Sequence, residues 1–149
     1  MDSLDRKILG VLQQDARASL QQIGQAVGLS SSPCWERIRK MEQAGVIEGY
    51  TVRLNAQALG LNDTVLVQVT LDSHSDNTLE KFGETLAAIP EVIEAYLVSG
   101  EYDYLLRVAV KDTRDYERLL REKLYKIKGI RHSQSSFVLR TLKKADLPL

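Results

Sequence analysis

The spacing of the apolar residues changes near residue 63, and this change constrains the fold more than any other feature of the sequence. Before it, apolar residues recur every three or four positions, the spacing of one face of an α-helix. After it, Val65, Val67 and Val69 recur at every second position, the spacing of one face of a β-strand. A chain of 149 residues can hold two small domains. We therefore predict a helical domain at 1–54, a linker at 55–62 and a mixed domain at 63–149.

The helical domain is predicted to contain three short helices. Leu4 and Ile8 lie one turn apart on the apolar face of the first. The second begins after Ser19, an N-cap residue that has Gln22 three positions later, the spacing of a capping box. It ends at Gly28, because glycine adopts the left-handed conformation of a helix C-terminus without strain.

The third helix is predicted to begin only a few residues later, with Ser32 at the N-cap and Pro33 at the first helical position. Its apolar side consists of Cys34, Ile38 and Met41. So short a connection between two helices is typical of a helix-turn-helix, whose second helix lies in the major groove of DNA. Residues 46–54 carry β-branched and aromatic side chains around a glycine, which predicts a short extended or hairpin segment acting as a wing.

The polar side of the third helix carries the residue types that contact DNA. Arginine pairs bidentately with guanine and glutamate accepts from cytosine, while serines near a helix N-terminus donate to phosphate. The predicted DNA-binding residues are Ser30, Ser31, Ser32, Pro33, Glu36, Arg37, Arg39 and Lys40. A second interpretation stays open, in which these three cations form a solvated face paired with Glu36 and Glu42. Trp35 either packs beneath the wing, which we favour, or faces DNA.

The second domain is predicted to follow the order β-α-β-β-α-β, the ferredoxin-like arrangement, so the fold class is α+β. We expect the strands near 65–71, 92–98, 104–110 and 135–142 and the helices near 79–89 and 116–127. Both faces of several strands are apolar, as at Leu66 beside Val67 and at Leu105 beside Leu106. Since two helices cover only one face of such a sheet, the other face is predicted to find a partner.

Composition narrows the classes of function. Lysine and arginine together number 20, as do aspartate and glutamate, so the chain does not coat nucleic acid by bulk positive charge, although a local basic surface is enough for DNA binding. No apolar run is long enough for a membrane span, and the acidic start does not resemble a signal peptide. The single Cys34 fits a reducing compartment. We expect a cytoplasmic protein.

Three stretches resemble the Lrp/AsnC family of leucine-responsive and asparagine regulators. The first is GLSSSPCWERIRKMEQAGVIEGY at 28–50, which is similar to that family's recognition helix and the following segment. The second is LVSGEYDYLL at 97–106, and LDRKIL at 4–9 resembles the first helix of the family. The resemblance covers nearly the whole chain. It implies a transcription regulator that binds double-stranded DNA, forms homodimers and higher oligomers such as octamers, and binds amino acids between the sensor domains of its subunits.

The turn at 99–103 is the predicted effector site. Asp103 can bind the ammonium of an amino acid, and the backbone near Gly100 can approach its carboxylate. The effector-binding residues that we predict are Ser99, Gly100, Tyr102 and Asp103, with Ser133, Ser135 and Ser136 added by the resemblance. In the alternative interpretation, Gly100 only makes the hairpin and Asp103 only caps it.

Two other functions are weighed against regulation by an amino acid. An enzyme on a ferredoxin-like scaffold is disfavoured, because His74 and His132 have no second ligand at metal-binding spacing and Cys34 falls on an inner helix face. No cofactor, metal site or catalytic residue is predicted. An architectural protein that binds DNA with little sequence preference would share the fold, and competition binding distinguishes it from a sequence-specific regulator.

Overall fold

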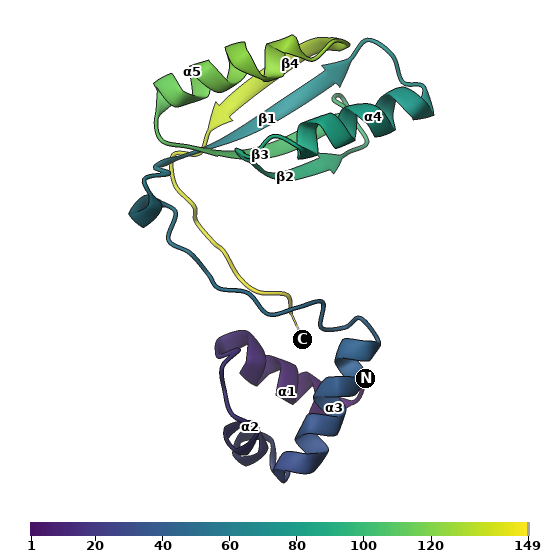
Figure 1. Ribbon diagram of the computed structural model, residues 1–149, viewed down its shortest axis with the longest axis vertical. Coiled ribbons are helices and arrows are strands. Elements are labelled where there is room, and N and C mark those ends of the chain that lie inside the picture. The colour runs from purple at the N-terminus through teal and green to yellow at the C-terminus, as the bar shows by residue number, and fades with distance from the viewer. Residues whose placement is uncertain (149) are drawn as a thin grey trace. The chain divides into compact units, whose positions relative to one another are not determined.

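The computed structural model describes residues 1–148, with only the backbone of Asp76, and divides into two compact units (Figure 1). The first unit consists of Met1–Leu54 together with the tail from residue 143, and the second is Asn55–Leu142. The sequence pattern assigns the tail to the second domain. In the structure it groups with the helical unit, where Gln13 Nε2 donates to the carbonyl of Leu147 at 3.1 Å.

The first unit is built from α1 (Ser3–Gln14), α2 (Leu20–Val27) and α3 (Ser31–Gln43). Their apolar faces meet in one small core, which contains Ile8, Leu9, Ile23, Val27, Cys34, Ile38 and Met41. The three residues predicted for the inner side of α3 all lie in this core, which confirms the helical spacing. Because that side is buried, the polar side of α3 faces outward.

The helix ends show where local chemistry determined the structure. Ser19 and Gln22 form the predicted capping box at α2, and Gly28 has the predicted left-handed conformation, with φ of 77°. The predicted start of α3 is wrong: Ser30 is the N-cap, and Pro33 is the third helical residue rather than the first. Proline fits there equally well, because the first N–H groups of a helix have no partner within the helix.

The segment after α3 carries no paired strand within residues 44–62, so the hairpin, one of the two forms predicted for the wing, is not formed. The chain leaves the helix at Gly45, which has φ of 70°. Val46, Tyr50 and Val52 are then exposed, and a single 3-10 turn, η1 (Gln57–Leu59), follows. A hairpin needs a second strand to satisfy its backbone groups, and this segment of the chain supplies none.

The second unit is one four-stranded antiparallel sheet in the order β2-β3-β1-β4, which confirms the ferredoxin-like prediction. Its strands are β1 (Asp63–Leu71), β2 (Val92–Leu97), β3 (Tyr104–Val110) and β4 (Ile130–Phe137). The helices α4 (Asp76–Ala87) and α5 (Thr113–Glu122) both lie on one face of this sheet (Figure 1). None of the described helices is both long and apolar enough to cross a bilayer.

Alternation along the strands separates the covered face from the open face. Val65, Val67 and Val69 of β1 are fully buried under the helices, together with Leu106 and Val108 of β3. The residues that alternate with these point to the open face of the sheet. On that face, Leu66 of β1 is 36 % exposed and Tyr96 of β2 is 50 % exposed. The core of this unit is therefore confined to the side of the sheet that carries the helices.

Two predicted boundaries in this unit are wrong. The last strand begins at Ile130, five residues before the predicted start at Ser135, because its first half is polar and shows no apolar alternation. The second predicted helix does not run to residue 127. It ends at Glu122, and a separate 3-10 turn, η2 (Leu124–Lys126), places Leu124 in the core.

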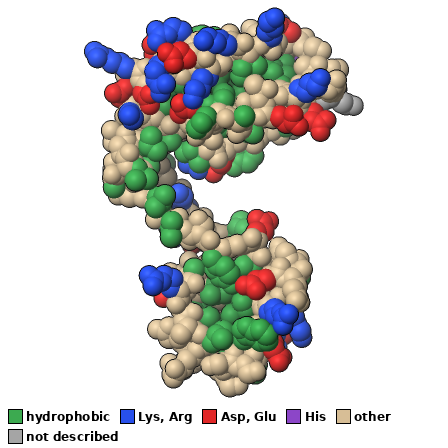
Figure 2. All heavy atoms as spheres, viewed as in Figure 1, with side chains coloured by type: hydrophobic (Ala, Val, Ile, Leu, Met, Phe, Trp, Pro, Cys, Tyr) green, Lys and Arg blue, Asp and Glu red, His purple; other side chains and the backbone are tan. Residues whose placement is uncertain are grey.

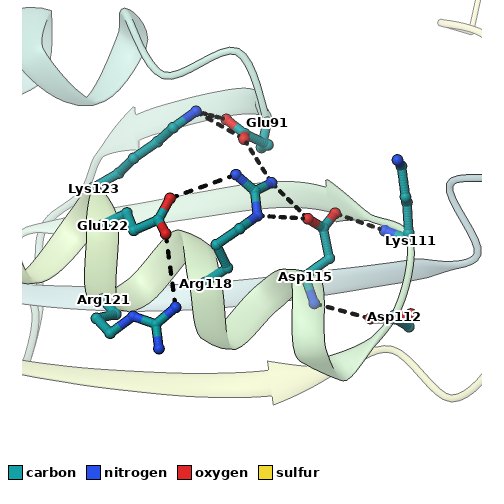
Figure 3. A network of polar contacts seen from close by, with 8 residues as sticks. All are labelled: Glu91, Lys111, Asp112, Asp115, Arg118, Arg121, Glu122 and Lys123. Atoms are coloured by element: carbon teal, nitrogen blue, oxygen red, sulfur yellow. Dashed lines mark hydrogen bonds and ion pairs between the residues drawn. The ribbon is translucent and has the colours of Figure 1, made fainter.

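A network of ion pairs joins α5 to the loop that precedes β2 (Figure 3). Lys123 Nζ lies 2.6 Å from a carboxylate oxygen of Glu91, and Arg118 pairs with Asp115 at 2.6 Å. Burial raises the pKa of Glu91, but the hydrogen bonds from Lys123 and from the backbone, together with the charges of Lys123 and Arg118, outweigh burial, so this pKa lies below its ordinary value. Figure 2 shows that basic and acidic side chains are intermixed over this part of the unit rather than separated into patches.

Candidate nucleic-acid interface

The outward side of α3 presents a contiguous polar surface. Its residues follow one another along the helix: Ser31, Ser32, Glu36, Arg39 and Lys40 are all exposed, as is the N-cap Ser30, while Pro33 is partly exposed. The buried side of the same helix packs against α1 and α2. The serines lie at the helix N-terminus, where free N–H groups favour an anion such as phosphate.

Arg39 and Lys40 have no acidic partner among the side chains that the structure describes, so their charges are available to a ligand. Arg39 instead lies over the ring of Trp35, with its central carbon 5.2 Å from the ring centroid. Trp35 is 48 % exposed and belongs to neither core cluster. The favoured interpretation, in which Trp35 packs beneath a wing, is therefore wrong.

Arg37 has a different environment from the one predicted. Its Nη1 donates to Asp2 at 2.7 Å and to Asp5 at 2.8 Å, which fastens α3 to the start of α1. The backbone N–H of Asp5 and the Arg37 guanidinium together lower the pKa of Asp2. A guanidinium held in this way is engaged within the unit, so we leave Arg37 out of the DNA surface.

The alternative interpretation, a solvated face in which the cations of α3 pair with Glu36 and Glu42, is wrong about these pairs. Arg37 pairs with α1 rather than with acidic residues of its own helix, and Glu42 accepts a hydrogen bond from the hydroxyl of Tyr50 at 2.9 Å. Burial, followed by this bond to the carboxylate, raises the pKa of Tyr50. The contact ties the segment after α3 back to the helix.

Gly24 is a positioning residue that the sequence analysis missed. Its carbonyl accepts from the N–H groups of both Gly28 and Leu29, at 2.8 and 2.9 Å, which folds the chain sharply between α2 and α3. A Cβ atom at Gly24 would lie 2.4 Å from the Leu29 carbonyl oxygen, closer than any real contact. The sequence feature that could have indicated Gly24 is a glycine in the middle of an otherwise favourable helix.

At the predicted effector turn, Asp103 holds the end of the sheet together. One carboxylate oxygen accepts from the Leu71 N–H at 2.7 Å, and the other lies 2.9 Å from His74 Nε2. Asp103 is mostly buried, while Ser99 and Gly100 are exposed, with φ of 132° at the glycine, and Tyr102 is partly exposed. The Asp103 side chain therefore binds the end of β1 and the loop that follows it, and its carboxylate retains lone pairs that can accept from a further donor.

The three serines of β4 do not form one set within a chain. Strand alternation places Ser133 and Ser135 on the helix-covered face, where the Ser135 hydroxyl lies 2.5 Å from that of Tyr116. Ser136 lies on the open face beside Leu66. Ser133 is paired with Val69, which in turn is paired with Tyr104, so it is the serine nearest to the turn in sheet register. No three acidic, histidine or cysteine side chains among the described residues are grouped to hold a metal ion.

Comparisons with known proteins match both units. A sequence model of the AsnC-type helix-turn-helix domain matches residues 1–42, and one of the Lrp/AsnC ligand binding domain matches residues 64–148. The leucine-responsive regulatory protein of Klebsiella pneumoniae is 37 % identical over 146 residues, covering 98 % of this chain and 89 % of that protein.

Solved structures resemble the chain over its whole length. An AsnC family transcriptional regulator from Agrobacterium tumefaciens is 41 % identical with a TM-score of 0.94, covering 99 % of this chain and 97 % of that one. A transcriptional regulator from Neisseria meningitidis, determined as a complex with L-methionine, is 32 % identical with a TM-score of 0.93, covering 99 % and 96 %.

Proposed function

The chain belongs to the Lrp/AsnC family of DNA-binding transcription regulators, and from that premise we propose how its two units divide the work. The first unit binds double-stranded DNA by laying the outward side of α3 in the major groove. Arg39 and Lys40 supply the charge, Glu36 accepts from a base, and the serines at 30–32 bind phosphate. The observation that carries this proposal is the exposed, unpaired Arg39 and Lys40 on a helix whose other side is buried.

Sequence-specific recognition is tested by competition. A duplex is enriched from a randomised pool by the protein itself, and its Kd is compared with that of a shuffled duplex at the same salt concentration. A regulator of this kind prefers its selected site by about a thousandfold or more. Equal Kd values for the two duplexes would favour an architectural protein instead. The salt concentration is held fixed because phosphate contacts alone make binding strongly salt-dependent.

The second unit senses an amino acid in this proposal. The effector lies at the 99–103 turn, its carboxylate near Gly100 and its ammonium against Asp103, whose two oxygens already order this end of the sheet. The L-methionine found with the Neisseria meningitidis regulator supports an amino-acid effector of this class. Thermal unfolding in the presence of each of the twenty amino acids tests it, because a ligand of the folded state raises Tm by mass action.

Self-association completes the proposed function. The open face of the sheet carries Leu66 and Tyr96 at 36 % and 50 % exposure, and two such faces can bury each other in a homodimer, from which an octamer is assembled. Light scattering of the full chain gives the assembly directly, and a monomer at micromolar concentration contradicts the proposal. The function rests on binding alone, so we assign no enzymatic activity.

A further inference from the structure

Trp35 is the single tryptophan of the sequence, and it lies on the DNA-facing side of α3. A ring of this size is usually buried, because it gains more than most side chains from removal of apolar area from water. Here the ring is 48 % exposed and belongs to neither core cluster. The ring contact it makes within residues 1–148 is with Arg39, one helical turn further along.

The geometry of this contact leaves Arg39 ready to bind. The guanidinium carbon lies 5.2 Å from the ring centroid, within the range of a cation–π contact. Such a contact uses the flat face of the guanidinium and leaves its N–H groups free around the edge. A bidentate pair with guanine O6 and N7 needs two N–H groups on that edge. Holding a long side chain in place also reduces the entropy that it loses on binding.

The Trp35 ring does not position the two neighbouring cations, Arg37 and Lys40. Arg37 is fastened to Asp2 and Asp5 on α1. Lys40 is five residues from Trp35, so it is not one helical turn away on the same face. Any effect of Trp35 on recognition must therefore pass mainly through Arg39.

We propose that Trp35 is a positioning residue for base recognition, whose ring presents the edge of the Arg39 guanidinium to a guanine in the major groove. The inference rests on the proposed function of α3. It makes Trp35 and Arg39 one recognition unit, in which the tryptophan contributes to sequence preference as well as to affinity.

A double-mutant cycle tests the inference on the duplex that the wild-type protein enriches from a randomised pool. The variants are Trp35→Leu, Trp35→Phe, Arg39→Ala and the combined Trp35→Leu/Arg39→Ala, measured at reduced salt so that weak complexes remain measurable. Trp35→Leu should raise Kd about two- to fivefold, the size of an exposed cation–π contact. Trp35→Phe, which keeps an aromatic face, should retain part of the affinity.

Sequence preference separates positioning from a merely structural role. Each guanine of the duplex is replaced in turn, and Trp35→Leu should weaken discrimination at the same base pair as Arg39→Ala. In the Arg39→Ala background, Trp35→Leu should change Kd no further. Lys40→Ala is the matched control, since it should weaken all duplexes alike and leave the effect of Trp35→Leu intact. Thermal unfolding checks that each variant is folded.

The failures of the two proposals are distinguishable. If Trp35→Leu weakens binding equally with and without Arg39, or shifts no single base preference, the positioning role is overturned and the DNA-binding role of α3 stands. If the wild-type protein enriches no duplex, both are overturned together.

Discussion

Arg37 and Arg39 are two residues apart on the same helix, yet the structure gives them opposite roles. Arg37 is held between Asp2 and Asp5, whereas Arg39 projects outward over Trp35. Spacing alone does not distinguish them, because the partners of Arg37 lie 35 and 32 residues away in sequence. The structure therefore divides a cluster that looked uniform into one cation that stabilises the unit and one that is free to contact DNA.

The Arg37 contacts predict a pH dependence of stability. The pKa of Asp2 and that of Asp5 lie below the ordinary 3.8, owing to backbone N–H donors and then to Arg37. A carboxyl whose pKa is lowered on folding adds stability above its unfolded pKa and loses it as pH falls through the folded value. Arg37→Met should therefore lower the free energy of unfolding at neutral pH, and the gap from wild type should close below the ordinary 3.8.

The measurement is urea unfolding at a series of pH values. Arg39→Met is the matched control, because that arginine has no acidic partner among the described residues and its substitution should give no pH-dependent gap. A gap between Arg37→Met and wild type that stays constant down to acid pH would contradict the account.

Gly24 gives a prediction in which two effects oppose each other. Alanine favours a helix interior over glycine by about 1 kcal/mol. The added Cβ would lie 2.4 Å from the backbone oxygen of Leu29, so the turn between α2 and α3 must shift. We expect the steric term to win, with a net loss of about 1–3 kcal/mol for Gly24→Ala in urea unfolding. Gln25→Ala, an exposed neighbour, should be near neutral, and a Gly24→Ala protein more stable than wild type would show the close approach to be unimportant.

At the scale of elements, strongly amphipathic segments were predictable and polar ones were not. The spacing of Cys34, Ile38 and Met41 identified the buried side of α3, since the core requires that pattern. The start of β4 was missed because Arg131 and His132 are exposed on an edge strand and give no apolar alternation. Serine is common at N-caps, so a run of three serines could not fix which one begins α3.

The predicted effector-binding residues also show what the sequence could not predict. The family resemblance implied that Ser133, Ser135 and Ser136 line one pocket, but adjacent residues of a strand point to opposite faces of the sheet. Ser135 contacts Tyr116 on the side of the sheet that carries the helices, and Ser136 lies on the open face. Likewise, only the fold shows that Asp103 bonds to Leu71, which is 32 residues away.

The ion pair between Glu91 and Lys123 links two elements, and its contribution can be measured. Burial raises the pKa of Glu91, but its hydrogen bonds and the charges of Lys123 and Arg118 together leave this pKa below the ordinary 4.5, so the stabilisation is present above that value and is lost in acid. Glu91→Gln should cost up to about 1 kcal/mol at neutral pH, and less at high salt. Glu117→Gln is the control, because its pair with Arg121 is about 62 % exposed and should contribute little. Equal costs for the two variants would contradict a special role of the partly buried pair.

At the scale of the whole molecule, the segment around residues 55–62 is the proposed link between the DNA-binding unit and the sensor. If an amino acid alters the assembly of the sensor domains, it changes the spacing of paired recognition helices, which must match half-sites about one helical turn apart. Coupling of this kind is typically about 1–3 kcal/mol and is reciprocal. The effector identified by thermal unfolding should therefore change the Kd for DNA by some factor. DNA should change the Kd for the effector by the same factor. Calorimetry with and without the selected duplex measures both, and unchanged effector affinity would remove the coupling.

Whether the outward side of α3 reads DNA is decided by a crystal structure of the full chain with its selected duplex. We expect α3 in the major groove, with Arg39 N–H groups about 3 Å from the O6 and N7 of a guanine and still lying over Trp35. A complex in which the duplex lies elsewhere and Arg39 and Lys40 face solvent would contradict this role of α3.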